Sequence, residues 1–320
     1  MMAVKRFLVV MLLSTGIVSA QEPELNALQL LMKMNLAMDA LNYEGTVAFF
    51  RNGKLEPMRY VHAAENGLQQ ERLISLNSPL REIIRNAGKV SCVFKESHQT
   101  IIDHRPFEHS FLIDMPDNFD KMGDIYQFEI VGEENIAMLP SYVVAIQPKD
   151  NDRYPRKIWV EKQQFLPLKV VVYDNSGNLL EQVIFTDIEV KDTLPFIDDK
   201  SIDTAYPTRH IHQIQPQSPE QAAFVVTELP KGFREVFFAR QPMHNAEQPV
   251  EHLLLSDGFT SVSVYMENKS ATMQPSIQSA GAVNSYSRVI DNYQLTVMGE
   301  VPAETVKSIA EGVKLRDLKN

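Results

Sequence analysis

The sequence predicts an α+β protein in which a large antiparallel β-sheet with one covering helix precedes a smaller α+β domain. Three observations lead to this prediction. One amphipathic helix pattern near the N-terminus is followed by a long succession of short strand patterns. Asn-Gly, Asp-Gly and Ser-Gly dipeptides separate several of these strands, which is typical of turns between antiparallel neighbours. A stretch rich in proline and glutamine, residues 204–221, then divides the strands into two groups.

The first twenty residues are typical of a secretory signal peptide. Lys5 and Arg6 form a positively charged start, Phe7–Val18 is apolar, and a small-residue cleavage motif ends at Ala20. The apolar segment is too short to span a bilayer as a stable helix, although a buried N-terminal helix is an alternative. We expect cleavage after Ala20, so that the mature chain begins at Gln21, is exported and is soluble. The residue directly after the cleavage site is Gln21 and not a cysteine, which argues against a lipid-anchored lipoprotein.

The mature chain is acidic and contains one cysteine. Loss of Lys5 and Arg6 with the signal peptide changes the formal net charge from −10 to −12. An acidic chain without a basic run argues against binding to nucleic acid and against direct docking on anionic membranes. Because Cys92 is the only cysteine, no internal disulfide is expected. Cys92 is either a buried strand residue, a reactive thiol or a bridge between two chains, and the sequence leaves a homo-oligomer open.

In the first domain, residues 21–203, one helix precedes a meander of strands. Leucines and methionines recur every three or four residues over Pro23–Asn42, which predicts an amphipathic helix. Asn52-Gly53 predicts a tight hairpin, because these residues tolerate positive φ. Phe107–Met122 mixes helix and loop patterns and is expected to lie across the mouth of the sheet. The predicted strands are Tyr43–Phe50, Met58–Ala63, Leu68–Leu76, Arg81–Asn86, Lys89–Phe94, Tyr126–Val131, Tyr142–Gln147, Lys157–Glu161, Leu168–Asp174 and Leu179–Val190.

A single helix covers only part of the concave face of so large a sheet. Loops, side chains or a ligand must fill the rest, so the sequence predicts a binding cavity. Bulky residues on the strands are candidates to line it, with two arginines whose guanidinium groups suit lipid phosphates. The alternatives are an ordinary core position for the aromatic residues and solvated ion pairs for the arginines. The candidates for the lipid cavity are Phe49, Tyr60, Arg81, Arg85, Phe94, Trp159, Tyr173 and Phe185.

The composition changes at Thr204. Runs of proline and glutamine stay extended and solvated, which predicts a linker over residues 204–221. In the second domain, residues 222–320, Asp257-Gly258 predicts a hairpin turn, Lys269–Ala280 a loop and Pro302 the start of a closing helix. The predicted strands are Phe224–Glu228, Phe233–Arg240, Val250–Ser256, Phe259–Glu267, Ser285–Val289 and Gln294–Met298.

The sequence contains no recognisable catalytic motif. Gly-x-Ser-x-Gly, HExxH, a glycine-rich phosphate loop and CxxC are all absent. His104 and His109 each follow an acidic residue, but loop histidines beside acids are usually solvated rather than metal ligands. His210 and His212 fall in the predicted linker. We therefore expect no enzyme, no cofactor and no metal site.

Short strings spread over nearly the whole mature chain occur in a characteristic order: Met34–Ala37, Leu41–Tyr43, Arg59–Ala63, Pro79–Arg85, Trp159 with Leu166–Leu168, Asn178–Gln182, Leu229–Phe233, Arg240–Pro242, Leu255–Phe259 and Gly299–Pro302. Together they resemble the RseB/MucB family of periplasmic regulators of the envelope-stress sigma factor, sigma-E. Two positions depart from the family pattern. Glu228 stands where an aromatic residue is usual, and Ser141 lies near where some relatives carry a cysteine.

The resemblance implies an unclosed β-barrel similar to the lipoprotein carriers, joined to a smaller α+β domain in the periplasm. It implies binding to the periplasmic domain of an RseA/MucA-like anti-sigma factor and protection of that factor from proteolysis. Lipopolysaccharide or a similar acylated ligand would release it. On motif grounds Arg240, Leu255 and Phe259 are candidate partner contacts. A periplasmic lipid or lipoprotein carrier is the alternative, but a carrier needs only the first domain.

Overall fold

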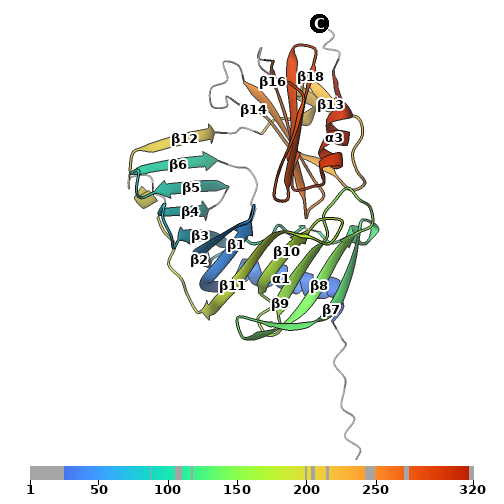
Figure 1. Ribbon diagram of the computed structural model, residues 1–320. Coiled ribbons are helices and arrows are strands. Elements are labelled where there is room, and N and C mark those ends of the chain that lie inside the picture. Colours follow the sequence, from blue (N-terminus) through green and yellow to red (C-terminus); the bar gives the residue numbers. More distant parts are fainter. Residues whose placement is uncertain are drawn as a thin grey trace, which may run out of the picture.

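The computed structural model describes residues 25–86, 88–104, 110–116, 118–198, 200–202, 206–213, 216–241, 249–269 and 274–316. The predicted signal peptide, with its cleavage site at Ala20 and Gln21, lies outside these residues. The smaller domain lies beside one row of strand ends of a large curved sheet (Figure 1). Within the described part of the chain, no helix has both the length and the apolar character needed to cross a membrane.

The large sheet has twelve strands among the described residues, and it does not close. Its order is β12-β6-β5-β4-β3-β2-β1-β11-β10-β9-β8-β7, so that β12 and β7 are its two edges. This confirms the predicted unclosed antiparallel barrel, apart from the parallel pair of β12 and β6. The strands are β1 (Asn42–Arg51), β2 (Lys54–Glu65), β3 (Leu68–Ser75), β4 (Arg81–Asn86), β5 (Lys89–Phe94), β6 (Gln99–His104), β7 (Tyr126–Ile136), β8 (Leu139–Pro148), β9 (Arg156–Glu161), β10 (Pro167–Tyr173), β11 (Leu179–Lys191) and β12 (Thr208–Gln213).

Helix α1, Ala27–Ala40, covers part of the inner face of this sheet and confirms the predicted helix. Asn26 begins it with a capping box, in which its Oδ1 accepts a hydrogen bond from the Gln29 amide at 2.9 Å. The apolar stripe of α1, including Leu30 and Met34, packs on side chains of β2, β7 and β9. Because that stripe is fully buried, most of the helix stability comes from packing rather than from intrinsic propensity.

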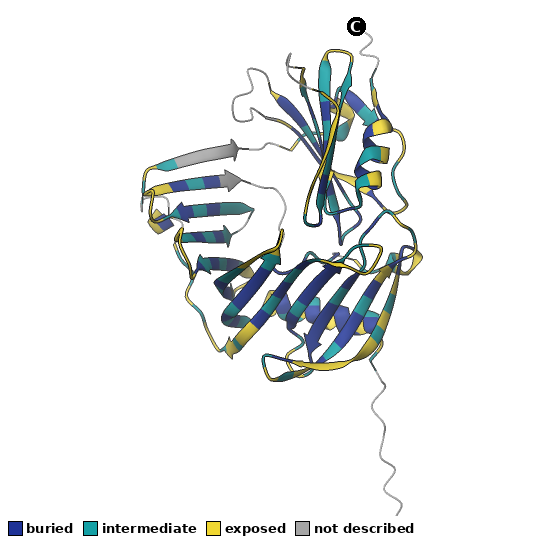
Figure 2. Cartoon of the chain, in the orientation of Figure 1, coloured by how far each residue is buried: buried dark blue, intermediate teal, exposed yellow. Residues whose placement is uncertain are grey.

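Short-range turn signals give most of the hairpins correctly. Asn52 and Gly53 both have positive φ, 53° and 72°, and join β1 to β2 as predicted. Buried and half-buried residues alternate along many of the strands, as expected for a sheet with two differently covered faces (Figure 2). Strand β6 was not predicted, and it follows a tight turn in which His98 has φ 51°.

Part of the predicted linker is extended but hydrogen-bonded to the large sheet rather than solvated. Thr208–Gln213 forms β12, with Thr208 opposite Thr100 of β6. Gln217 already pairs with the smaller domain, because its amide donates to the Phe238 carbonyl at 2.8 Å. The physical reason is that an uncovered sheet edge offers backbone hydrogen bonds to any extended chain, whatever its composition. Only residues 214–216 lie in sequence between β12 and Gln217, the first residue that is bonded to the smaller sheet, while the domain limits themselves stay a prediction.

The smaller domain is a six-stranded sheet, among the described residues, in the order β14-β15-β16-β19-β18-β17. Helix α3, Ala303–Glu311, begins directly after Pro302 as predicted and packs on β18 and β19. The exception is β17, which lies inside the predicted loop Lys269–Ala280. All five of its residues are exposed, so no hydrophobic alternation marks it as a strand. The strands are β13 (Phe224–Val226), β14 (Arg234–Gln241), β15 (Val250–Ser256), β16 (Ser261–Asn268), β17 (Ser276–Ala280), β18 (Val283–Ile290), β19 (Tyr293–Gly299) and β20 (Val313–Leu315), of which β13 pairs with β20.

Candidate functional site

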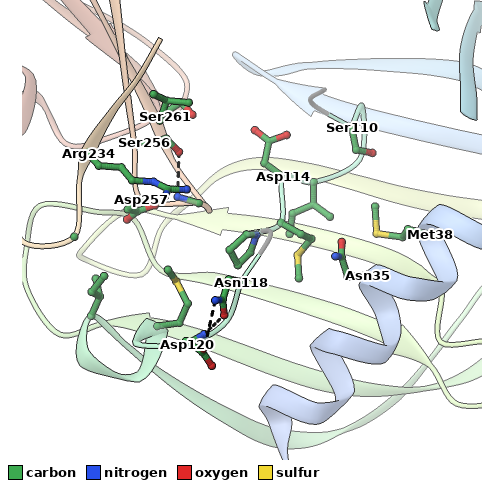
Figure 3. A pocket seen from close by; sticks show the side chains of 18 of the residues that line it. Asn35, Met38, Ser110, Asp114, Asn118, Asp120, Arg234, Ser256, Asp257 and Ser261 are labelled. Carbon is green, nitrogen blue, oxygen red and sulfur yellow. Dashed lines mark hydrogen bonds between the residues drawn. The ribbon is translucent and has the colours of Figure 1, made fainter. Parts of the chain in front are cut away.

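A cleft of about 950 Å³ lies between the two domains (Figure 3). One wall is α1, the floor is the segment that follows β6, and the opposite wall is formed by β14, β15 and β16. Polar and apolar groups are mixed along it, which suits a ligand that carries both. Its lining includes Asn35, Met38 and Asp39 from α1, Ser110, Asp114, Asn118 and Asp120 from the floor, and Arg234, Val236, Leu254, Ser256 and Ser261 from the smaller domain.

Three of the predicted cavity residues lie beneath α1. Phe49, Tyr60 and Phe185 are between 0 and 8 % exposed and belong to the core that packs on the helix. The rings of Tyr60 and Phe185 meet edge to face at 5.7 Å between centroids. The helix therefore already covers this part of the inner face. These three side chains are ordinary core residues, which was the alternative to lining a cavity.

Arg81, Arg85 and Phe94 continue the same inner face beyond the helix. Arg81 is directly opposite Phe94 in the pairing of β4 and β5, and Ile83 is directly opposite Cys92, so all of them share one face. Phe94 and Cys92 are only half-buried. Arg81 contacts Glu56 at 2.6 Å across the strands. The inner face of β4 and β5 thus combines arginines with apolar groups that are not fully covered.

Trp159 and Tyr173 point to the opposite face of the sheet. Their strands pair so that Trp159 lies opposite Lys169, whose Nζ is 4.2 Å from the centre of the indole. The indole Nε1 also donates to Glu134 at 2.8 Å. Alternation along a strand shows which residues share a face but not which face is concave, so the sequence could not separate Trp159 and Tyr173 from the other candidates.

A buried carboxylate, Glu71 on β3, fixes the floor of the cleft to the large sheet. Its Oε1 accepts hydrogen bonds from the Tyr60 hydroxyl at 2.9 Å and from Ser110 Oγ at 2.8 Å. Its Oε2 accepts from the Phe111 amide at 2.9 Å and from Arg85 Nε at 3.1 Å. Burial raises the pKa of Tyr60 well above its ordinary value, so the hydroxyl remains a donor. The carboxylate is therefore fully partnered although it is 2 % exposed.

A second buried carboxylate, Asp257, joins the two domains. It lies in the turn between β15 and β16 and accepts hydrogen bonds from the amides of Phe259 at 3.0 Å and Thr260 at 2.9 Å. From the large domain, Arg153 Nε and the Tyr126 hydroxyl both donate to its Oδ2, the latter at 2.7 Å. Burial raises the pKa of Tyr126 and keeps the hydroxyl protonated.

The predicted partner contacts are mostly buried. Phe259 is 1 % exposed and enters the core of the large domain, where its ring centroid is 5.3 Å from that of Tyr126. Leu255 is fully buried in the core of the smaller domain. Only Arg240 reaches the surface, where it contacts Glu251 at 2.7 Å. The motif indicates a contact surface, but in this arrangement Phe259 binds the protein's own large domain, and a partner could reach it only if the domains separated.

No cluster of three or more His, Cys, Asp or Glu side chains in the described residues is arranged to hold a metal ion. His98 lies against the ring of Tyr206, at 5.2 Å between centroids. His109 and the side chains of His104, His210 and His212 are outside the described residues.

Family comparisons agree with this two-domain arrangement. The family described as MucB/RseB N-terminal domain matches residues 26–214, and the MucB/RseB C-terminal domain family matches residues 218–314. The chain belongs to the MucB/RseB family. This confirms the resemblance found in the sequence. The N-terminal match ends just after β12, so this family domain includes the strand that falls within the predicted linker.

Individual MucB/RseB relatives match over most of the chain. The sigma-E factor regulatory protein RseB of Escherichia coli K12 is 28 % identical over 294 residues, which cover 89 % of each chain. The sigma factor AlgU regulatory protein MucB of Pseudomonas aeruginosa is 26 % identical over 286 residues, covering 85 % of this chain and 86 % of that protein. A crystal structure of MucB in complex with MucA(peri) has a TM-score of 0.69 at 23 % identity, covering 91 % of this chain and 99 % of that one. This likeness shows that the fold is shared.

Sequence reasoning missed the buried charged residues that hold the cleft floor and the two domains of this MucB/RseB chain in place. Glu71, Arg153 and Asp257 look like ordinary charged residues in the sequence, because their partners are far away along the chain. Gly232 belongs to the family string Leu229–Phe233 and has a φ of 90°. It lies so close to Ile125 of the large domain that an added Cβ would be 2.1 Å from Ile125 Cδ1. A glycine that follows a lysine in a turn carries no signal of that contact.

Proposed function

We propose that this protein is a non-enzymatic periplasmic regulator that binds the periplasmic domain of an RseA/MucA-like anti-sigma factor and protects it from regulated proteolysis. Family membership supports the proposal, together with relatives named as regulators of sigma-E and AlgU. Solved structures of MucB in complex with MucA support the choice of partner. The observation that carries most weight is the presence of both family domains in one chain, with a cleft between them.

Release by lipopolysaccharide or a similar acylated ligand is the second part of the proposal. The inner face of β4 and β5 supports it, because Phe94 and Ile83 are half-buried there and Arg81 and Arg85 lie on the same face. Apolar groups favour acyl chains, and guanidinium groups favour the phosphates of a lipid headgroup. The periplasmic location follows from the signal peptide predicted before Gln21, and the mass of the exported protein would test it.

The decisive experiment uses the purified mature protein, the periplasmic segment of the anti-sigma factor and the protease that cleaves it. We expect the protein to bind the segment and slow its cleavage, and lipopolysaccharide fragments to reverse both effects together. By linkage, the segment must weaken lipid binding by the same factor by which lipid weakens segment binding. If lipid and segment bind together with unchanged affinities, the release mechanism is wrong.

A lipid or lipoprotein carrier is the second candidate, because the half-covered inner face of β4 and β5 suits a carrier as well. A carrier would transfer its acylated cargo to an acceptor without any effect of the anti-sigma segment. The native mass of the purified protein, measured with and without the segment, would show whether a homo-oligomer forms.

A further inference from the structure

One segment of the large domain connects the two buried carboxylates. Residues 110–116, which we name the strap, run along the floor of the cleft between α1 and the smaller domain (Figure 3). At its beginning, Ser110 Oγ and the Phe111 amide donate to the two oxygens of Glu71. In its middle, Leu112 and Ile113 are 7 and 6 % exposed and belong to the core beneath α1. The strap is therefore held along its length by the large domain.

The other end of the strap contacts the turn that carries Asp257. Gly258 has a φ of 104°, and a Cβ built on it would lie 2.7 Å from the Cβ of Pro116. The backbone of the turn thus rests directly on Pro116, with no room for a side chain. Neighbouring Asp257 makes the buried ion pair with Arg153, and Phe259 enters the large-domain core. A shift of the strap at Pro116 therefore acts on the turn that docks the smaller domain.

We propose that the carboxylate of Glu71, which Arg85 holds in place, controls the docking of the smaller domain through the strap. Two of the four hydrogen bonds accepted by Glu71 come from the strap, and hydrogen bonds to an ionised carboxylate are the stronger kind. A loss of negative charge at Glu71 weakens both at once. The strap then loosens, Pro116 no longer supports Gly258, and the turn with Asp257 and Phe259 leaves its site. This inference concerns the protein alone and does not depend on the proposed partner or ligand.

The chain offers a matched control on the same two strands. Arg72 of β3 and Glu82 of β4 form an ion pair at 2.7 Å, but on the face of the sheet opposite to Glu71 and Arg85. This second pair has the same chemistry and similar burial, with no contact to the strap. Glu71→Gln and Glu82→Gln both remove the charge of a glutamate–arginine pair. Only Glu71 is bonded to the strap; it is also bonded to the Tyr60 hydroxyl, whereas Glu82 has Lys95 at 3.6 Å as a second partner.

The experiment measures the distance between the domains in the free mature protein. Spin labels are attached at two exposed positions, Glu65→Cys on β2 and Ser308→Cys on α3, in a Cys92→Ser background. Pulsed electron paramagnetic resonance measures the distance between the two labels. We expect one narrow distance distribution for the parent and for Glu82→Gln. Glu71→Gln should broaden it and add longer distances, as should Asp257→Asn, which breaks the docking contact directly.

Several outcomes overturn the proposal. A narrow distribution for a folded Glu71→Gln shows that the carboxylate does not control docking, and a narrow one for Asp257→Asn shows that docking does not need the turn. Equal broadening by Glu82→Gln means that any ion pair on these strands has the effect. If Glu71→Gln fails to fold by circular dichroism, Ser110→Ala decides, because it removes one strap bond and leaves the Glu71–Arg85 pair intact. A narrow distribution for Ser110→Ala then counts against the coupling.

Discussion

Arg153 of the large domain and Asp257 of the smaller domain form an ion pair in which neither side chain is exposed to solvent. Each charge has further partners. Arg153 Nη1 also contacts Asp150 at 2.6 Å, and Nη2 donates to the Lys231 carbonyl. Arg153 lies over the ring of Phe233, with its guanidinium carbon 4.6 Å from the ring centre. Buried charges are tolerated only with such complete pairing, so this residue pair is one of the specific contacts that hold the domains together, beside the buried ring of Phe259.

Replacement of Asp257 by Asn should lower the free energy of unfolding by about 3–5 kcal/mol, because it removes the fully buried carboxylate that pairs with Arg153 and leaves it with the partly exposed Asp150. Urea titration at pH 7 measures the change. Glu300→Gln is the control, since Glu300 is 40 % exposed and lies 3.9 Å from Arg156. Its loss should cost less than about 1 kcal/mol. Equal effects of the two substitutions would contradict the central role of the buried pair.

Phe259→Ala should destabilise the protein by about 3–5 kcal/mol, the usual cost of truncating a buried phenylalanine. The side chain contacts Tyr126, Phe119 and Phe128 of the large domain, so the loss falls on the domain contact as well as on a core. Val236→Ala, at a residue that is 39 % exposed, should cost less than about 1 kcal/mol. Thermal unfolding and limited proteolysis report both effects. A Phe259→Ala protein as stable as the Val236 variant would show that the ring is dispensable.

Two glycines with positive φ separate backbone strain from steric contact. Gly177 has φ 86° and no atom within 4 Å of the position that an added methyl group would take, whereas Gly258 has φ 104° and meets Pro116. Gly177→Ala should cost about 1–2 kcal/mol for the conformation alone. Gly258→Ala should cost a further 1–3 kcal/mol or so, because the methyl group forces Pro116 or the turn to move. If denaturant midpoints shift equally, the contact with Pro116 contributes nothing.

The pH dependence of stability should carry a contribution from Glu181. Burial raises the pKa of this carboxyl above its ordinary value of 4.5, despite the Arg51 guanidinium at 2.9 Å. The folded state therefore binds the proton more tightly than the unfolded state does. The resulting stabilisation is complete below pH 4.5 and is lost as the pH rises through the folded-state value. Compared with Glu181→Gln, the parent should gain relative stability on acidification. A difference between the two proteins that is constant from pH 4 to 7 would show that the shift is absent.

Phe94 and Tyr173 form a matched pair for the proposed acyl-chain surface. Both are half-buried aromatic residues on strands of the large sheet, but Phe94 lies on the inner face and Tyr173 on the outer one. Phe94→Ala should weaken binding of a fluorescent fatty acid, while Tyr173→Ala should leave it unchanged. The reverse result would move the acyl-chain site to the outer face.

Local sequence signals predicted most of the elements, and long-range contacts account for what was missed. The helix from Ala27 to Ala40 and the Asn52-Gly53 hairpin are determined by neighbouring residues, so periodicity and turn chemistry suffice. Strand β12 depends on the free edge of β6, more than a hundred residues earlier. No pattern within Thr208–Gln213 indicates that pairing.

The candidate site was predictable only in part, for the same reason. Residue type and alternation gave one list of cavity candidates, in which a first group, Tyr60 and Phe185, and a second, Arg81 and Phe94, stand beside Trp159 and Tyr173 of the opposite sheet face. They could not show that α1 fills the first group's surroundings and leaves the second only half-covered. The string around Phe259 is typical of the family and predicts a partner contact there. The burial of Phe259 results from a domain contact that no local pattern encodes.

The shortness of the connection between β12 and Gln217 has a consequence for competition. Three residues, 214–216, join the two sheets, so Gln213 and Gln217 cannot be more than about 14 Å apart even in a fully extended chain. A smaller domain that leaves its docking site therefore remains close to it. Its effective concentration there is of the millimolar order expected for short flexible linkers. A molecule that takes the place of Phe259 from outside has to compete against that concentration, and the tighter the docking contact is, the more strongly weak ligands are excluded.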